Sequence, residues 1–540
     1  MASKLCLLFW LLLHHQRPSM TSPILRAGCR PGTEQECKKN KFVPGHTLLG
    51  EGINIVTMEA TGSFLLDLQE VGEKCTVCVN PHNNNALQKL PKAMADWRPE
   101  TSCSKNIQSS VSRSKVKVAD EATSSVQNDW KVGLNVSAYK TVNARTAVGG
   151  SQSQMAKFAD SKSVTDDYSF LSHKLECAFY GFRLGSDPSL TPHFAKTLQE
   201  LPDTYDRMTK TEYRRLIDSF GTHYITRVKV GGRTQEVTAV RTCQVAMNGF
   251  KMDEVKDCLS VEAEIGVNKG DIDTSVDSKV DHCKNKLAKT DLGGDFHRAF
   301  KERVWKVIGG NGTFDLLSSD KTTADAFKKW MESLKYYPGL VSYSLESIHN
   351  LVRMKGSKKE NLRVAISDYI KEKALTQKCS CPGHHVGNDC SCTCRASKYT
   401  SSDCCPTHRG AAKLHVTIKS GTGLYGDVWS ETDAYVLFKF DDATMRTPTI
   451  VNRNKPAWNK KYELGFVELR EGKKYTIEVW DEDNEADDLL GRCHKPLNSG
   501  NTLETCYLNH GSLSYSLDVT CADHLQGRVC HDYISVPPSA

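Results

Sequence analysis

The sequence predicts an α+β protein of several domains, in which a large mixed region is followed by a small cysteine-rich module and an all-β sandwich. The chain has 540 residues, more than one hydrophobic core usually organises. The first part mixes strand-like and helix-like patterns, seven cysteines crowd into one short stretch, and the last part is dominated by period-two alternation. The composition, 39% hydrophobic and 25% charged, is that of a globular chain. The net charge of +7 is small for this length, so nucleic acid is not expected as a partner.

Residues 1–20 predict a secretory signal peptide. Lys4 precedes the apolar run Leu5 to Leu13, which is too short to span a bilayer and is followed by polar residues. Removing this segment takes Cys6 away and leaves 20 of the 21 cysteines, an even number that can pair completely in an oxidising compartment. No later run approaches the roughly 20 apolar residues of a spanning helix. We therefore expect a secreted protein.

Residues 21–375 predict one α+β domain. Apolar residues alternate with polar ones at 130–138, 259–267 and 272–280, which predicts strands, whereas 211–220 and 323–334 show helical periodicity. Long stretches of both patterns without an internal linker favour a single domain.

Residues 376–408 predict a disulfide-stapled module of the size of an epidermal-growth-factor-like (EGF-like) domain. A zinc site is the alternative, but zinc ligands usually come as separated pairs, and a secreted context disfavours free thiolates. Because seven is odd, one cysteine is expected to bridge to a neighbouring domain. The pair Cys75 and Cys78 has the spacing of a redox motif, and we expect structural pairing there instead. The seven cysteines are Cys379, Cys381, Cys390, Cys392, Cys394, Cys404 and Cys405.

Residues 409–525 predict a β-sandwich, with a short tail at 526–540. Strand alternation is clear at 414–418 and 475–479, and turn signals separate the runs. Two acidic loops stand out, one around Asp427 and Asp433 and one from Asp481 to Asp488, which carries six acids in eight residues. A hard divalent cation with oxygen ligands offsets such repulsion, and calcium suits a loose carboxylate cup better than magnesium does. A solvated acidic face is the alternative.

These loops resemble the C2 domain, a calcium-dependent lipid-binding sandwich. The resemblance rests on Asp427, on the runs 432–436, 454–459 and 479–483, and on 488–491. It implies calcium as cofactor and a set of aspartate ligands in which Asp487 and Asp488 share the last ligand position. The implied set is Asp427, Asp433, Asp481, Asp483, Asp487 and Asp488.

Two further expectations concern this end of the sandwich. Tyr425, Val428 and Trp429 flank the first acidic loop, where they either enter lipid or pack the base of the loop. Neighbouring negative charges disfavour ionisation, so the aspartates should titrate above their isolated value near 3.9. Calcium binding should then weaken as the pH falls towards about 5.

A second set of residues lies in the large region: Tyr213, Phe220, Gly221, Thr222, His223, Tyr224, Gly231 and Gly232. His223 alone could suggest a catalytic base or a metal ligand, but no partner motif accompanies it, which favours packing at the start of a strand. The paired glycines lack the Gly-Lys-Ser/Thr of a phosphate loop, which favours a backbone bend. Together, these residues and their spacing resemble the membrane-attack-complex/perforin (MACPF) signature.

The MACPF resemblance implies a bent central antiparallel sheet with flanking helical clusters. It also implies a cytolytic protein of lymphocyte-mediated killing, stored in granules and secreted with granule proteases as delivered partners. Such a protein binds target phospholipid membrane through calcium, oligomerises into a ring and inserts helical clusters as β-hairpins. Residues 134–179 and 259–300 are the candidate hairpins, because each carries the alternation that a barrel strand needs.

Two other functions compete with a pore former. A secreted lipid-modifying enzyme is disfavoured, because neither Gly-x-Ser-x-Gly nor His-Glu-x-x-His occurs. A calcium-dependent membrane-binding MACPF protein without lytic activity remains the alternative. Asn135 and Asn311 lie in glycosylation sequons.

Overall fold

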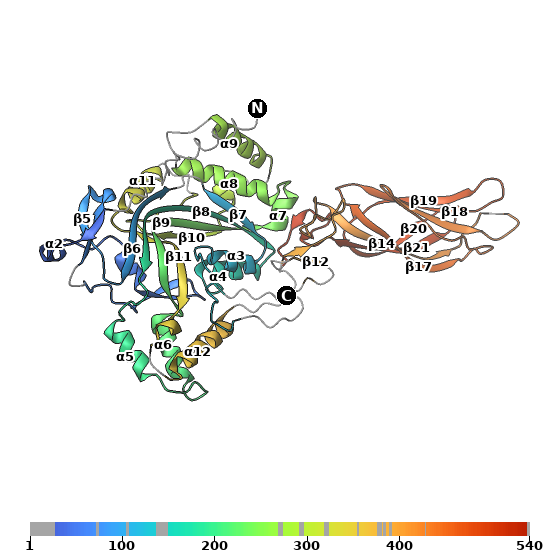
Figure 1. The fold of residues 1–540 in the computed structure, drawn as a ribbon. Helices are drawn as coiled ribbons and strands as arrows, with labels where there is room; N and C mark the ends of the chain where they lie inside the picture. Colours follow the sequence, from blue (N-terminus) through green and yellow to red (C-terminus); the bar gives the residue numbers. More distant parts are fainter. Residues whose placement is uncertain are drawn as a thin grey trace, which may run out of the picture.

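A bent antiparallel sheet organises the N-terminal region of the computed structural model (Figure 1). Its strands follow the order β3-β2-β9-β8-β6, with β10 and β11 also paired to β9 and β7 paired to β8. The structure describes residues 28–71, 75–103, 107–136, 149–267, 274–290, 296–317, 323–353, 356–374, 381, 385–387, 391–426 and 428–536. The strand bounds are β2 Glu51–Asn54, β3 Glu59–Phe64, β6 Met94–Cys103, β7 Gln108–Ser112, β8 Tyr168–Leu184, β9 His223–Arg241, β10 Arg303–Ile308 and β11 Gly339–Ser347.

The long strands β8 and β9 form the spine of this sheet. They pair from Tyr168 opposite Arg241 to Arg183 opposite Arg227, with one bulge near Ala178. Strand β9 pairs with β11 along its first half and with β10 along its second half. The last part of the first candidate hairpin, up to Phe179, therefore lies in strand β8.

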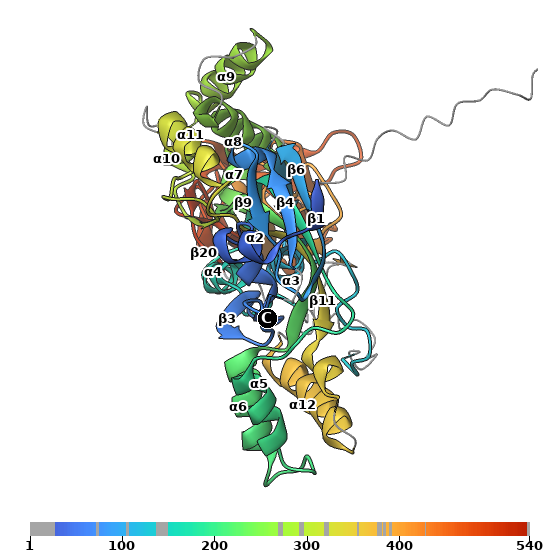
Figure 2. The same cartoon turned by 60° about the vertical axis from the view of Figure 1, so that its left-hand side comes forward.

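Helices lie at both ends of the sheet, as Figures 1 and 2 show from two sides. Helices α8 and α9 lie at one end, and α5, α6 and α12 lie at the other. Helices α6 and α11 confirm the two helical predictions. The bounds are α3 Lys115–Ala122, α4 Gln154–Ser163, α5 Pro192–Glu200, α6 Lys210–Phe220, α7 Thr242–Met247, α8 Met252–Val267, α9 Thr274–Leu287, α10 Phe296–Ala299, α11 Thr323–Ser333 and α12 Lys358–Lys373.

Three predicted strands are wrong in this state of the protein. Residues 259–267 lie in α8, residues 274–280 of the next run lie in α9, and 130–136 form turns and irregular structure, while 137–138 and 272–273 lie outside the described residues. The reason is visible in α8, where Val255, Leu259 and Ala263 are buried at four-residue spacing. Residues four apart lie on one face of a helix and also on one face of a strand, so this spacing fits both elements.

Smaller elements complete the first region. Strands β1 Cys29–Pro31, β4 Thr76–Asn80 and β5 Ala86–Lys89 form a three-stranded sheet beside helix α2 Glu34–Lys39. Short 3-10 helices span His46–Leu49, Pro81–Asn83 and Ile348–Leu351. Among the described residues, no helix combines the length and the apolar character needed to cross a membrane.

The C-terminal region is a sandwich of two four-stranded antiparallel sheets, as predicted, and it projects from the rest in Figure 1. Its core includes Phe438, Tyr475 and Tyr515, and the two tyrosine hydroxyls lie 2.7 Å apart. One sheet holds β17 Ala457–Glu468, β14 Ala411–Thr422, β21 Ser512–Cys521 and β20 Gly500–Tyr507; the other holds β16 Ala443–Arg446, β15 Ala434–Phe440, β18 Lys474–Asp481 and β19 Asp488–Pro496. Two short pairs flank the sandwich: β12 His385–Val386 with β13 Cys392–Thr393, and β22 Leu525–Gln526 with β23 Asp532–Tyr533.

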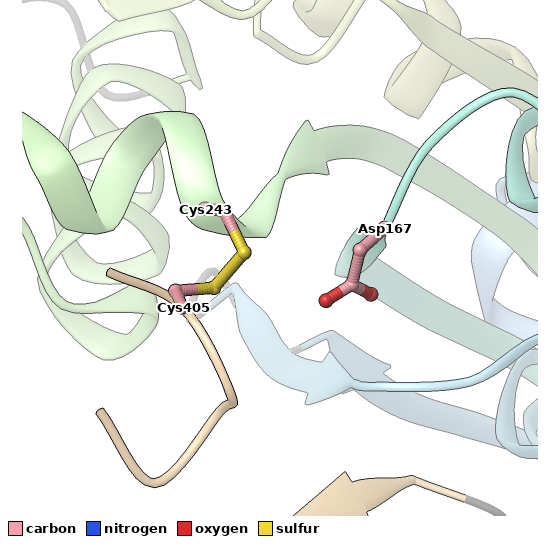
Figure 3. Close-up of side chains that lie close together, drawn as sticks. All are labelled: Asp167, Cys243 and Cys405. Carbon is pink, nitrogen blue, oxygen red and sulfur yellow. A yellow bond between two sulfur atoms is a disulfide. The ribbon is translucent and has the colours of Figure 1, made fainter. Parts of the chain in front are cut away.

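Disulfides hold the cysteine-rich module, as the sequence predicts. The described bonds there are Cys381–Cys392 and Cys394–Cys404. A third bond joins Cys405 to Cys243 of α7 and ties the module to the large region (Figure 3). The bridge to a neighbouring domain is thereby confirmed. Cys379 and Cys390 lie outside the described residues.

Cys75 and Cys78 have structural roles, as predicted, because they pair with Cys37 and Cys29.

Asp167 lies beside the Cys243–Cys405 bond and is close enough for the three residues to resemble a metal site (Figure 3). The two sulfur atoms are bonded to each other, so they cannot act as thiolate ligands. Burial raises the pKa of Asp167 to about 6; His524 opposes this shift, whereas Asp166 and Asp403 add to it. The junction therefore holds a carboxyl group that is protonated in mildly acidic solution.

This carboxyl group predicts a pH-dependent junction. A raised pKa means that the folded state binds the proton more tightly, so the stabilisation is complete below the unfolded pKa near 3.8 and is lost as the pH rises through about 6. Asp167→Asn should remove up to about 3 kcal/mol of the fall in unfolding free energy between pH 4 and pH 7. Urea unfolding of both proteins at the two pH values measures the difference. Equal losses in both proteins would contradict the assignment.

Candidate calcium and membrane site

Three neighbouring strands of the sandwich bring acidic residues to one end. Ala434 at the start of β15 lies opposite Asp481 at the end of β18, and Asp481 lies opposite Asp488 at the start of β19. Asp433 immediately precedes β15. The sheet register therefore places Asp433, Asp481 and Asp488 on adjacent strand ends.

Backbone hydrogen bonds fix the first of these carboxylates. Asp433 donates its N–H to Oδ1 of Asp481 at 2.6 Å, and Oδ1 of Asp433 accepts the N–H of Asn452 at 2.6 Å. The carbonyl of Asp433 accepts the N–H of Glu482 at 2.9 Å. A Cβ at Gly426 would lie 1.7 Å from Oδ2 of Asp481, so the first loop needs glycine to pack against this carboxylate.

Asp487 and Asp488 differ in their surroundings. Asp487 accepts the hydroxyl of Tyr435 on one oxygen at 2.6 Å and the N–H of Asp483 on the other at 3.2 Å. The Tyr435 hydrogen bond lowers the pKa of Asp487, so the expected upward shift is wrong for this residue. Asp488 is exposed and forms no ion pair with a described lysine or arginine.

Arg446 was missed by the sequence interpretation. Its guanidinium lies 3.9 Å from the centre of the Tyr435 ring and 3.2 Å from Glu482. Glu482 also accepts the hydroxyl of Thr449, and this bond together with Arg446 lowers its pKa. One of the six acids in the second loop is thus neutralised within the protein and points towards Thr449. Only the pairing of strands β15 and β16 brings Arg446 there, and no local sequence signal reveals it.

The donor set fits a hard cation. Asp433, Asp481, Asp483 and Asp488 offer oxygen atoms at one end of the sandwich, which is the ligand chemistry that calcium prefers. Asp433, like Asp488, has no ion pair with a described basic side chain. Asp427 lies outside the described residues.

Exposed apolar side chains surround these loops. Trp429 is 97% exposed, Val428 is 75% exposed, and Tyr425 is 49% exposed with its ring edge-on to His510. Packing of the loop base therefore does not account for Val428 or Trp429. Val451 was missed from sequence; it is 65% exposed and precedes Asn452, which binds Asp433.

The MACPF signature residues pack at the start of β9. Tyr213 is buried and donates its hydroxyl to the carbonyl of Pro202 at 2.7 Å, while Phe220 packs against Phe194. Gly221 ends helix α6 with a φ of +78°, a conformation that glycine adopts readily. These residues therefore join α6 to the sheet.

His223 has a packing role. It is fully buried, and burial lowers its pKa to about 4, so the ring is neutral at physiological pH. Its Nε2 donates to the carbonyl of Trp130 at 2.9 Å, and its Nδ1 accepts the hydroxyl of Thr222 at 2.8 Å. Tyr224 donates its hydroxyl to Glu346 at 2.8 Å. His223 belongs to no cluster of metal-ligating side chains within the described part of the chain.

Gly231 and Gly232 mark the place where β9 changes partner. A Cβ at Gly231 would lie 2.0 Å from the carbonyl of Cys177, and a Cβ at Gly232 would lie 2.4 Å from the ring of Trp330. Backbone and helix approach so closely that only glycine fits, which supports the bend over a phosphate loop.

Gly231→Ala should destabilise the large region. The methyl group meets a backbone carbonyl that cannot rotate away, so the two central strands must separate, at a cost on the order of 3 kcal/mol. Denaturant unfolding measures the change, and Gly28→Ala is the matched control, because its nearest atom would be 3.8 Å away. Equal stability of both variants would show that the sheet accommodates the methyl group.

Both sequon asparagines are exposed. Asn311 lies in a turn after β10, and Asn135 lies in irregular structure, not on the strand edge that the sequence suggested. Their glycosylation stays a prediction.

Comparison with known proteins agrees with these observations. Residues 42–379 match the MAC/Perforin domain, and residues 412–511 match the C2 domain. The chain is 41% identical to Perforin-1 of Mus musculus over 520 residues, covering 94% of this chain and 93% of that protein. It is 38% identical to Perforin-1 of Homo sapiens over 519 residues with the same coverage, and 24% identical to the complement component C8 alpha chain of Oryctolagus cuniculus over 398 residues, covering 68% and 66%.

The two domain matches fall on the two regions that the fold separates, and the similarity to the perforins extends across both. The chain therefore belongs to the membrane-attack-complex/perforin (MACPF) family, which is a family of pore-forming rather than enzymatic proteins.

Proposed function

We propose that this protein is a secreted, perforin-like cytolysin that attaches to target phospholipid through calcium, assembles into a homo-oligomeric ring and inserts β-hairpins as a transmembrane barrel. The observation that carries the proposal is the acidic strand-end cluster, with the exposed side chains of Trp429 and Val428 beside it, at the end of a sandwich. The cysteine-rich module that precedes this sandwich is disulfide-bonded to helix α7 of the MACPF region. Asp433, Asp481, Asp483 and Asp488 would hold calcium, which would supply the positive charge that attracts lipid phosphates, and the exposed side chains of Val428 and Trp429 would enter the bilayer.

Storage in cytolytic granules and delivery of granule proteases belong to the same proposal. The carboxyl group of Asp167 supports storage under acidic conditions, because its raised pKa stabilises the junction at low pH. The boundaries 21–375, 376–408 and 409–525 stay proposals too, as does the signal peptide.

We assign calcium to Asp427, Asp433, Asp481, Asp483 and Asp488. The bound ion would screen repulsion among the carboxylates and present a positive surface to lipid. Asp487 is a weaker candidate, because both of its oxygens already accept hydrogen bonds.

The preference for Asp488 over Asp487 as a calcium ligand can be tested by two adjacent substitutions. Asp488→Asn should raise the calcium concentration for half-maximal liposome attachment about tenfold, whereas Asp487→Asn should raise it less than about threefold. Sedimentation of liposomes over a calcium titration measures both. The reverse order of the two effects would move the ligand to Asp487.

Dye release from liposomes tests the function as a whole. Release in calcium and its loss in chelator support the pore. Calcium-dependent attachment without release would favour the alternative, a membrane-binding MACPF protein without lytic activity. Release in chelator would contradict the calcium step.

A further inference from the structure

The ladder between β9 and β10 has one uninterrupted register. Arg303 lies opposite Thr238 and Ile308 lies opposite Arg233, so the residue numbers of every pair add up to 541. The N–H of Ala239 donates to the carbonyl of Glu302 at 2.7 Å, which extends the register by one more pair. The chain that contains α8 and α9 therefore leaves and re-enters the sheet at directly opposed positions.

The disulfide between α8 and α9 obeys the same register. It joins Cys258 to Cys283, and these two numbers also add up to 541. Both cysteines lie on helices here, so the sheet does not impose the agreement. Their Cα atoms are 5.7 Å apart, close to the roughly 4.5 to 5.5 Å of opposed residues in antiparallel strands.

If the register is continued from the disulfide towards residues 267 and 274, apolar and charged side chains fall on opposite faces of the hairpin. The odd positions 259–267 and the opposing even positions 274–282 form one face, and the intervening positions form the other. Each strand of this stretch has nine residues, which matches the roughly 9 to 11 of a spanning β-strand. On the first face, Leu259, Val261, Ala263, Ile265 and Val267 lie opposite His282, Val280, Ser278, Val276 and Thr274; on the second, Ser260, Glu262 and Glu264 lie opposite Asp281, Lys279 and Asp277.

A slip of one residue would destroy this separation. Odd positions would then face odd positions, so that Val261 would share a face with Asp281 or Lys279. The midpoint of the register falls between Gly270 and Asp271, which lie outside the described residues; a Gly-Asp pair is typical of a two-residue hairpin turn.

We propose that the Cys258–Cys283 disulfide sets the register of the membrane-spanning hairpin and stays closed while α8 and α9 are converted into strands. This inference rests on the proposed pore-forming function and gives the two cysteines a positioning role in it. The bond lies one residue pair outside the apolar stretch, on the polar face, so the sulfur atoms need not enter lipid. The disulfide forms one cross-strand pair before the helices are converted into strands. Closing the hairpin then costs only the entropy of the short loop between the two cysteines.

Moving the bond by one helical turn tests the proposal. Positions four residues apart share a helix face, so new cysteines at 262 and 279 can pair in the soluble protein. Glu262→Cys with Lys279→Cys, in a chain that also carries Cys258→Ser and Cys283→Ser, keeps the sum at 541. Lys279→Cys with Cys283→Ser, which leaves Cys258 in place, changes the sum to 537. Mass spectrometry of unreduced peptides verifies each bond.

The full-length variants are compared by calcium-dependent attachment to phosphatidylcholine liposomes and by dye release. All should attach like the wild type. The in-register variant should release dye within threefold of the wild-type rate, the out-of-register variant at least tenfold more slowly, and Cys258→Ser/Cys283→Ser at least threefold more slowly. Equal release by the out-of-register variant would overturn the proposal, as would free thiols at 258 and 283 in wild-type pores alkylated before digestion.

Failure of the proposed function and failure of the register role alone give different results. If the wild type attaches but releases no dye, the proposed function fails and the register role fails with it. If the wild type releases dye and loss of the native bond leaves the rate unchanged, only the register role fails. The wild-type thiol measurement needs no variant, so a folding defect in one variant leaves the proposal open to refutation.

Discussion

Asp433→Asn should abolish calcium-dependent attachment to liposomes at physiological calcium. Asparagine keeps the size of the side chain and an oxygen that can accept the N–H of Asn452, so the loop stays in place. What is lost is one negative charge from a cluster that holds a divalent ion by charge and oxygen donors. We expect the calcium concentration for half-maximal attachment to rise at least tenfold, equivalent to about 1.4 kcal/mol.

Asp442→Asn is the matched control for this variant. Asp442 is exposed and lies beyond the opposite end of β15, in the turn before β16, so its removal changes the net charge equally without touching the site. Asp483→Asn should behave like Asp433→Asn. A calcium titration in which Asp433→Asn and Asp442→Asn coincide with the wild type would refute the metal assignment.

Cys243→Ser/Cys405→Ser should cause the largest loss of stability among the described disulfides. The bond closes a loop of 162 residues, and on the chain-entropy account a loop of this length contributes about 5 kcal/mol. Removing it frees the cysteine-rich module from α7 while the acidic loops at the far end of the sandwich keep their geometry. Calorimetry should therefore show a lower melting temperature, and calcium-dependent attachment should be retained.

The comparison for this variant is Cys493→Ser/Cys506→Ser. That bond spans 13 residues between β19 and β20, so its removal should cost about 3 kcal/mol. If the short-loop variant melts at a lower temperature than the long-loop variant, the Cys243–Cys405 bond does not hold the two regions together as proposed.

Local patterns in the sequence were sufficient for the sandwich. Strands β14 and β18 were recognised because one face of each is buried and the other is solvated, which produces clean alternation. The same reasoning gave the wrong element for α8, since its apolar residues fit both periods. Packing against the rest of the fold decides between the two, and that information is not local.

The candidate site was predictable to the extent that its residues cluster in the chain. The acids of the second loop are contiguous, whereas Arg446 and Val451 reach the site from another connection and have no motif of their own. The partner of the odd cysteine could not be predicted from the sequence either. An odd number of cysteines means that one must pair outside the module, but only the contact between α7 and the module identifies Cys243 as its partner.

The four-residue spacing of buried side chains in α8 has a consequence for mutation. Leu259, Ala263 and Val267 are buried in α8 and are all odd-numbered, so these residues, which the helix hides from water, would face hydrocarbon in the proposed strand. Each of these positions must be apolar for two reasons: the packing of α8 in the soluble protein and the lipid-facing side of the proposed strand. A polar substitution there should destabilise the soluble fold and, in the proposed pore, the membrane-spanning strand as well, so such sites ought to tolerate fewer replacements than ordinary core positions of equal depth.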